Sequence, residues 1–415
     1  MTKRTFRTSF ATLLVLGTIG VVSAGGSPSA AAGSRTTITP VLGHLNAPRG
    51  LAFDGQGSLY VSESGYAGAG PFGLTQTGRV SKYAHGSAHA SWSTSFESLY
   101  ASEDPTQPPD VLGPEGISAL GGNCSKRSHG HASEREGERE GEGGCQIRMI
   151  MSESHDGVAA ASGGAADPTQ LGHLFRLNGA TGAATSVSDV GDQMYKWTGD
   201  RVALFPDDFP DSNPYGVLVT KDDHSDRVRT FVADAGANTI SEIMADGTTR
   251  VISYIPNETT VPFRDSTPTC IAQGPDGMLY VATLNFVANL FVDGSGRSDV
   301  WRVDPNANFP TEPTLWTTGL TTATACTFDS EGNFWATEMF QPNAAGAPGD
   351  VVRIPFEHPD QLDRIGGGML PLPGGIAEGP DHAMYVSINS SSPVKDSGAV
   401  VKISSHERGD DNHDE

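Results

Sequence analysis

The stretch PRGLAFDGQGSLYVSESG, residues 48–65, decides the fold because its pattern returns, in eroded form, at five further places in the chain. Residues 50–53 form a short apolar strand, residues 54–57 a tight turn, and residues 58–63 an alternating strand rich in β-branched and aromatic side chains. This pattern predicts a β-hairpin. Two strands cannot bury both of their faces, so a hairpin that repeats about every fifty residues indicates units that share one core.

The other five copies each begin at a short turn, followed by an inner strand and two or more further strands. Proline fixes the incoming turn, and glycine lets backbones approach closely near a common axis. The five turns are Gly113–Gly116, Asn213–Gly216, Pro268–Cys270, Thr324–Cys326 and Pro373–Gly375.

Six four-stranded units predict an all-β fold, a six-bladed β-propeller over residues 36–404, because radial repetition leaves only short, protected edges. The alternative, a parallel β-helix, has coils with a shorter period than these units. The last unit lacks an outer strand, whereas residues 36–41 form a spare one. We therefore expect the spare strand to pair with residues 398–403 and to close the ring.

The segments outside the propeller indicate export. Lys3, Arg4 and Arg7 precede an apolar run that ends in a small-residue cleavage pattern, so residues 1–24 are predicted to be a signal peptide. Residues 25–35 are predicted to be a flexible leader and residues 405–415 an acidic tail. No stretch reaches the about 20 apolar residues that a membrane-spanning helix needs. We expect a protein secreted to the periplasm or the extracellular space.

The charge of the chain excludes two classes of partner. The formal net charge is −22, and loss of the three basic residues of the signal peptide takes it to −25. Such a field repels nucleic acid and anionic membranes. We expect neither as a partner, and we expect a monomer.

Three stretches resemble the ScyD/ScyE family of secreted bacterial β-propeller proteins. They are PRGLAFDGQGSLYVSESGYAGAG (48–70), DSNPYGVLVTKDD with TFVADAGANTISEI (211–223 and 230–243), and PTCIAQGPDGMLYVATLNF (268–286). Asp234 and Asn238 also resemble an NHL repeat. The resemblance implies a secreted propeller, associated by genetic neighbourhood with scytonemin-type pigment pathways and found outside them, with no settled reaction.

A charged insertion at residues 122–146 departs from that family. It has almost no apolar residue, so we expect it to be disordered. Cys124 and Cys145 bound it, and exported chains keep disulfides, so we expect these two cysteines to form a bridge. His129 and His131 belong to the solvated charge run, and the spacings typical of zinc sites are absent.

Cys270 and Cys326 are predicted to occupy the same position, the glycine position of the inner strand, in consecutive units. A disulfide needs Cα atoms about 4.4–6.8 Å apart, which neighbouring inner strands can meet or miss. The alternatives are a bridge and two small buried thiols.

Hairpin geometry predicts a polar mouth at one end of the channel. The end of each second strand returns to the start of the first, which brings Glu63 beside Arg49, and it places Glu153, Asp234, Thr283, Glu338 and Ile388 at matching positions. The predicted ligand-binding residues are Arg49, Glu63, Glu115, Glu153, Asn213, Tyr215, Asp234, Thr269 and Glu338.

The four carboxylates Glu63, Glu153, Asp234 and Glu338 are a candidate Ca²⁺ site, because hard cations take several carboxylate and carbonyl oxygens. Calcium is the one candidate cofactor. The alternative is that each acid binds backbone N–H groups of its own blade, as Asp234 would in the turn to Asn238.

The long connection between Leu177 and Asn213 is expected to cross this mouth as a partial lid, because long ordered connections are usually functional. Its aromatic residues would add apolar walls to a small-molecule site. The alternative is that they pack on the rim of the second and third blades. The aromatic residues concerned are Tyr195, Trp197, Phe205 and Phe209.

Three function classes remain. The first is a secreted module that binds a small molecule or a protein at the mouth, the second a calcium-dependent lactonase-type hydrolase, and the third a soluble quinoprotein sugar dehydrogenase. The Glu-Gly-Pro start typical of the second class is absent, and no Arg and His cluster suits an ortho-quinone. No G-x-S-x-G motif is present, so serine-hydrolase chemistry has no support and no catalytic residue is assigned. We take the first class as the working hypothesis.

Overall fold

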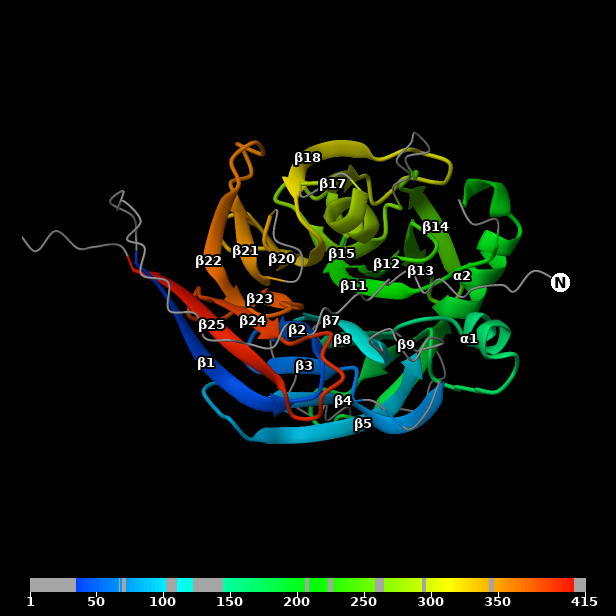
Figure 1. Cartoon of the computed structure of the whole chain (residues 1–415), viewed down its shortest axis with the longest axis horizontal. Coiled ribbons are helices and arrows are strands. Elements are labelled where there is room, and N and C mark those ends of the chain that lie inside the picture. Colours follow the sequence, from blue (N-terminus) through cyan, green and yellow to red (C-terminus); the bar gives the residue numbers. More distant parts are fainter. Residues whose placement is uncertain are drawn as a thin grey trace, which may run out of the picture.

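The computed structural model describes residues 35–66, 68, 72–101, 110–121, 145–205, 209–222, 227–257, 265–292, 296–342 and 347–406. These residues form six antiparallel sheets arranged as blades in a ring (Figure 1). The prediction of an all-β, six-bladed β-propeller is confirmed.

The first three blades follow the order of the chain. Blade 1 contains β2 (Pro48–Phe53), β3 (Leu59–Glu63), β4 (Gly73–Tyr83), β5 (Ala90–Ala101) and β6 (Asp110–Leu112). Blade 2 contains β7 (Pro114–Leu120), β8 (Gln146–Met151), β9 (His173–Leu177) and β10 (Ala184–Asp189). Blade 3 contains β11 (Pro214–Lys221), β12 (Val228–Asp234), β13 (Thr239–Ile243) and β14 (Thr249–Tyr254).

The last three blades complete the ring. Blade 4 contains β15 (Pro268–Gln273), β16 (Leu279–Thr283), β17 (Ser298–Val303) and β18 (Thr314–Leu320). Blade 5 contains β19 (Ala323–Phe328), β20 (Phe334–Phe340), β21 (Pro348–Ile354) and β22 (Asp363–Leu370). Blade 6 contains β23 (Ile376–Glu378), β24 (Met384–Ile388), β25 (Gly398–His406) and β1 (Arg35–Leu45).

Two α-helices, α1 (His155–Ser162) and α2 (Val190–Gly199), lie on the outside of the ring beside blades 2 and 3 (Figure 1). They were not predicted, although the signals for α1 are present in the sequence. Ser154 caps its N-terminus by accepting from the Gly157 N–H, and Gly163 ends it in the left-handed conformation. Two short turns, η1 (Val202–Leu204) and the π-helical η2 (Ala288–Val292), are the other helical elements in the part of the chain that the structure describes. None of the helices among the described residues is long and apolar enough to span a membrane.

The ring closes as predicted. β1 pairs antiparallel with β25, from Arg35 opposite His406 to Leu45 opposite Gly398, and so supplies the outer strand of blade 6. Leu42 and Leu45 of β1 are buried in a core cluster shared by blades 1 and 6. The two ends of the described chain are therefore fastened to each other.

Neighbouring inner strands lie so close together at the axis that the glycine position of each strand has little or no room for a side chain. A Cβ on Gly50 would lie 2.6 Å from the Glu115 carbonyl oxygen, and one on Gly116 would lie 2.6 Å from the Tyr215 carbonyl oxygen. The prediction that glycine permits the crowded approach at the axis is thus confirmed.

A disulfide joins Cys270 and Cys326, with Cα atoms 5.6 Å apart, so the bridge is present and the two-thiol alternative is wrong. The predicted equivalence of the two positions is also wrong. Pro268 pairs with Thr283 as Ala323 pairs with Glu338, so Cys270 corresponds to Ala325 and Cys326 lies one residue further along its strand. Blade 5 has alanine where blade 4 has proline, and this substitution hid the offset.

Several sequence predictions fall on residues that the structure does not describe. They are the signal peptide, most of the leader, most of the charged insertion and most of the acidic tail. Cys145 is disulfide-bonded, but its predicted partner Cys124 lies outside the described residues, so the pairing stays a prediction.

Removal of β1 tests the closure. A chain that begins at Ala47 should melt roughly 5 °C or more below the parent, because burial of Leu42 and Leu45 contributes about 1.5–3 kcal/mol each. Differential scanning calorimetry measures the change, and a chain that begins at Arg35 is the control, since it keeps β1. Equal melting temperatures for the two shortened chains would show that β1 does not fasten the ring.

The disulfide has a direct chemical test. Peptide mapping of unreduced protein by mass spectrometry should recover Cys270 and Cys326 in one cross-linked species that separates on reduction. Alkylation of both thiols before reduction would contradict the bridge.

Candidate functional site

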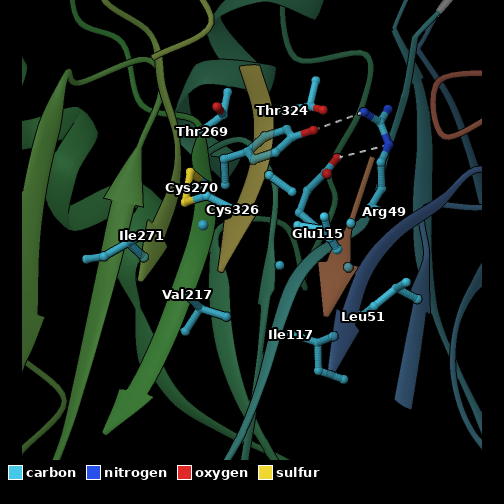
Figure 2. A pocket seen from close by; sticks show the side chains of 17 residues that line it. Arg49, Leu51, Glu115, Ile117, Val217, Thr269, Cys270, Ile271, Thr324 and Cys326 are labelled. Carbon is cyan, nitrogen blue, oxygen red and sulfur yellow. Dashed lines mark hydrogen bonds and ion pairs between the residues drawn. A yellow bond between two sulfur atoms is a disulfide. The ribbon is translucent and has the colours of Figure 1, made fainter. Parts of the chain in front are cut away.

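A cavity of about 70 Å³ lies on the axis of the ring, where the inner strands of all six blades meet. Its lining falls into three layers, which Figure 2 shows in part. The polar layer consists of Arg49, Glu115, Tyr215, Thr269 and Thr324. The middle layer consists of Gly50, Gly116, Gly216, Cys270, Ala325 and Gly375. The third layer is an apolar ring of Leu51, Ile117, Val217, Ile271, Cys326 and Ile376.

The polar layer is organised around Arg49, which is only 4% exposed. Its Nη2 donates to Asp110 Oδ1 at 2.8 Å, and its Nη1 donates to the Tyr215 hydroxyl at 3.5 Å. Its Nε lies 3.7 Å from Glu115 Oε1, which is an ion-pair distance but too long for a hydrogen bond. The single hydroxyl proton of Ser64 is shared between the Pro114 carbonyl, at 3.0 Å, and the same Glu115 oxygen, at 3.4 Å.

Burial shifts the ionisation of this layer. It raises the pKa of Glu115 to about 8, because Arg49 and the Ser64 hydroxyl offset the loss of hydration only in part and Asp110 adds repulsion. Burial alone would lower the pKa of Arg49, but Glu115 and Asp110 outweigh it and raise that pKa, so the guanidinium stays charged. Burial and Glu115 also raise the pKa of Tyr215. At neutral pH the layer therefore holds a charged Arg49, bonded to Asp110, beside a neutral carboxyl and a neutral phenol.

Two polar atoms of this layer lack partners. Among the residues that the structure describes, Arg49 Nε and Glu115 Oε2 are buried without a hydrogen bond. Most buried polar atoms are bonded, so this pair is available to a water molecule or another group that enters the cavity. The two threonines differ, because Thr269 Oγ1 donates to the Ala323 carbonyl at 2.7 Å and Thr324 Oγ1 to the Pro373 carbonyl at 2.9 Å.

Three of the predicted mouth acids act as structural clamps within their own blades. Glu63 accepts from the Asn46 N–H at 2.8 Å and from Arg79 Nε at 2.7 Å, and Glu338 accepts from the Thr321 N–H at 2.7 Å and from Arg364 Nε at 2.9 Å. These two carboxylates are fully buried, and neither lines the cavity.

Asp234 behaves in the same way. Its Oδ1 accepts from the Asn213, Gly236 and Ala237 N–H groups at 2.8–3.1 Å, and its Oδ2 accepts from Ser212 Oγ at 2.7 Å. The alternative of acids that bind N–H groups of their own blades therefore describes Glu63, Asp234 and Glu338.

Glu153 is the exception among the four acids. Its predicted place at the end of the second strand is wrong, because β8 ends at Met151, which pairs with Pro114. Glu153 follows in the left-handed region, with φ 63°, and its N–H donates to Asn213 Oδ1 at 3.2 Å. Burial, together with Asp211, Asp234 and Asp110, raises its pKa well above the ordinary value.

The structure does not gather the four acids into one metal site, because Glu63 and Glu338 are each held by an arginine of their own blade. Within the described ranges, the one group of three candidate ligands with atoms within 4.8 Å is His155, Asp156 and Asp192. It belongs to the outer helices α1 and α2, away from the cavity (Figure 1).

The predicted lid is wrong for the aromatic residues whose contacts are described. Trp197 of α2 packs edge-on against Phe309 at 5.2 Å, and Phe205 packs against Tyr254 of β14 at 6.1 Å, so both lie at the rim of the blades. A different cluster packs against Tyr215 at the mouth, just beyond the end of β16 and at the last two residues of β20. This mouth cluster consists of Leu284, Phe286, Met339 and Phe340.

The structure therefore keeps part of the predicted site together. Arg49, Glu115, Tyr215 and Thr269 share the polar layer, and Asn213 joins Glu153 to Asp234 beside it. Asp110, Ser64 and Thr324 were missed. Asp110 sits on a three-residue strand with no pattern of its own, whereas Thr324 was missed because the one-residue offset in blade 5 matched Ala325, and not Thr324, with Thr269.

Comparisons with known proteins find distant structural similarity alone. No protein-family model matches the chain, and no curated protein matches its sequence. Solved structures similar to it include a glucose dehydrogenase from Thermus thermophilus, with 14% identity, a TM-score of 0.47 and coverage of 89% of this chain and 100% of that chain. A PQQ-bound aldose sugar dehydrogenase from Streptomyces coelicolor has 11% identity, a TM-score of 0.47 and coverage of 89% and 99%. The calcium-binding protein regucalcin from Agrobacterium tumefaciens has 13% identity, a TM-score of 0.43 and coverage of 88% and 92%. At these identities and TM-scores the similarities assign no function to this chain, and the propeller architecture rests on its own sheet topology.

The raised pKa of Glu115 predicts a pH-dependent stability. Between the ordinary pKa of a glutamate and about pH 8, the folded chain holds a proton that the unfolded chain releases, so stability falls as pH rises through this window. Glu115→Gln should melt near the parent temperature at pH 5 and above it at pH 8, since the amide cannot ionise. The difference grows by at most about 1.4 kcal/mol per pH unit.

Calorimetric melting at pH 5, 6, 7 and 8 measures this effect. Glu331→Gln, which removes a largely exposed carboxylate, controls for the loss of one negative charge. A Glu115→Gln variant that loses stability relative to the parent as pH rises would contradict a neutral Glu115.

Proposed function

We propose that this chain is a secreted propeller of the ScyD/ScyE type that binds a small molecule at the polar end of its axial cavity. The observation that carries the proposal is the buried, unpartnered pair of atoms, Arg49 Nε and Glu115 Oε2, in the wall of that cavity. An apolar surround with a few convergent polar groups and a shifted pKa is typical of a small-molecule site.

The size of the cavity limits what enters it. A volume of about 70 Å³ accommodates a few water molecules or one compact chemical group, since one water needs about 10–15 Å³ on this measure. A larger ligand would insert one end and leave its body among the mouth cluster of Leu284, Phe286, Met339 and Phe340. Below the middle layer the cavity lining is the apolar ring, so a ligand that reached that depth would meet apolar side chains.

A calcium-dependent hydrolase is the second candidate, and the crowding of Glu153 by Asp211 and Asp234 favours it. A cation near Glu153 would relieve the repulsion, and Asn213 adds an amide beside it. A quinoprotein dehydrogenase fits less well. The lining contains one arginine and no histidine, and its volume is too small for a fused-ring quinone.

A fragment screen tests binding at the cavity. Saturation-transfer NMR of the full chain with neutral, anionic and cationic molecules of five to eight heavy atoms should find binders that Ala325→Val excludes, because the added methyl groups fill the middle layer. Ala245→Val, at an exposed turn, is the matched control and should leave binding unchanged. If every fragment that binds the parent also binds the Ala325→Val variant equally well, the cavity is not a ligand site.

Calcium titration separates the two candidates. Calorimetry of protein purified without chelator, with a parallel assay of glucono-δ-lactone hydrolysis, should show neither stoichiometric calcium binding nor calcium-dependent turnover. If both occur and both are lost in Glu153→Gln, the hydrolase replaces the binding module.

A further inference from the structure

The proton of a neutral Glu115 has one favourable position. Oε1 faces the positive Arg49 guanidinium at 3.7 Å, which favours an unprotonated oxygen at that place, and it lies 3.4 Å from Ser64 Oγ, whose hydroxyl also reaches the Pro114 carbonyl at 3.0 Å. Oε2 has no partner among the described residues and is the remaining place for the proton. The cavity wall therefore presents two hydrogen-bond donors, Arg49 Nε–H and Glu115 Oε2–H.

The charges around these donors decide what can accept from them. The positive charge of Arg49 is paired with Asp110 at 2.8 Å, and Glu153, Asp211 and Asp234 add acidic groups on the side of blade 3. Because Asp110 already pairs with Arg49, the one cationic residue of the cavity lining, an incoming anion would find no free positive charge there. An incoming cation would face the two N–H and O–H donors and the guanidinium itself. A neutral acceptor meets neither penalty.

The shape of the cavity adds a second requirement. The middle layer consists largely of glycine backbone, and the threonine hydroxyls are committed as donors to the Ala323 and Pro373 carbonyls. One oxygen with two lone pairs and a narrow attached group fits these walls. A carbonyl oxygen has both properties, because its two lone pairs lie in one plane and can accept from two donors.

We infer that the molecule bound here is neutral and compact at one end, and that it presents a carbonyl oxygen, as in a lactone, lactam or ketone, to Arg49 Nε and Glu115 Oε2. This inference rests on the proposed function, since it assigns a ligand class to the same cavity. Arg49 and Glu115 are the binding residues, and Asp110 is a positioning residue that fixes the guanidinium.

The inference makes binding depend on the protonation of Glu115. The groups that face this carboxyl are Arg49 of β2, Asp110 of β6, Tyr215 of β11 and the Ser64 hydroxyl after β3. As pH rises through about 8, Glu115 loses its proton and Oε2 changes from donor to charged acceptor. A carbonyl oxygen would then be repelled, whereas Arg49 would keep its charge.

The experiment uses δ-valerolactam as the neutral carbonyl probe, with acetate and methylammonium as the charged comparisons. Ligand-observed NMR titrations of the full chain at pH 7 and pH 9 should show lactam binding that weakens at least fivefold at the higher pH. In Glu115→Gln, whose amide donates at both values, the change should be less than twofold, and Glu115→Ala should lose at least tenfold at pH 7. Glu331→Gln should keep the fivefold pH effect.

Each outcome distinguishes the ligand class from the site itself. Lactam affinity that is equal at pH 7 and pH 9 in the parent, or tighter binding of acetate or methylammonium, overturns the carbonyl inference and leaves the cavity as a site of another class. The carbonyl inference also fails, and the site remains, if the lactam does not bind while other fragments bind the parent but not the Ala325→Val variant. If no fragment binds the Ala325→Val variant more weakly than the parent, both the proposed function and the inference are overturned.

Discussion

The close approach of inner-strand backbones at the axis is the constraint on which the rest of the structure depends. Where Gly50 and Gly116 face the next strand there is no room for a Cβ, so the blades can meet only if these positions are glycine or, where the spacing is looser, a small side chain. The same closeness brings Cys270 and Cys326 within bridging distance. A wider ring would lose both features and would open the axial cavity to bulk water.

The tight axis also explains why a charged group survives there. Burying a guanidinium is costly unless it is paired and hydrogen-bonded, and Arg49 meets that condition through Asp110, Tyr215 and the Val111 carbonyl. Glu115 does not, because its nearest charged neighbour is 3.7 Å away, and so it takes the neutral form. Arg49 has a close ion-pair partner and serves the structure, whereas Glu115 has none and its carboxyl is available to a ligand.

The hairpin repeat was sufficient to predict six blades, the closing strand and the shared position of Arg49, Glu115, Tyr215 and Thr269. These features depend on local periodicity and on the return of a hairpin to its starting point. The bonding partners and exact positions of the predicted mouth acids were not predictable in this way. Glu63 is bound by Arg79 of the neighbouring strand β4 and Glu338 by Arg364 of β22, both outside the repeated hairpin, and Glu153 lies two residues beyond the end of its strand. Asp110 lies on β6, the fifth strand of blade 1, and the register of Cys326 was hidden by the alanine that replaces proline at the start of β19, so neither could be read from the repeat.

The pairing of β1 with β25 has a mechanical consequence. Arg35 lies opposite His406, so the two ends of the described chain leave the ring side by side at the same end of one strand pair. A load that pulls these ends apart would act on the hydrogen bonds one after another, as in peeling, rather than on all of them together. The ring would then open at blade 6 under a small force, while the cross-linked blades 4 and 5 stayed joined. Attachment of both ends to one surface would place no such load on the seam and would leave the opposite side of the ring free.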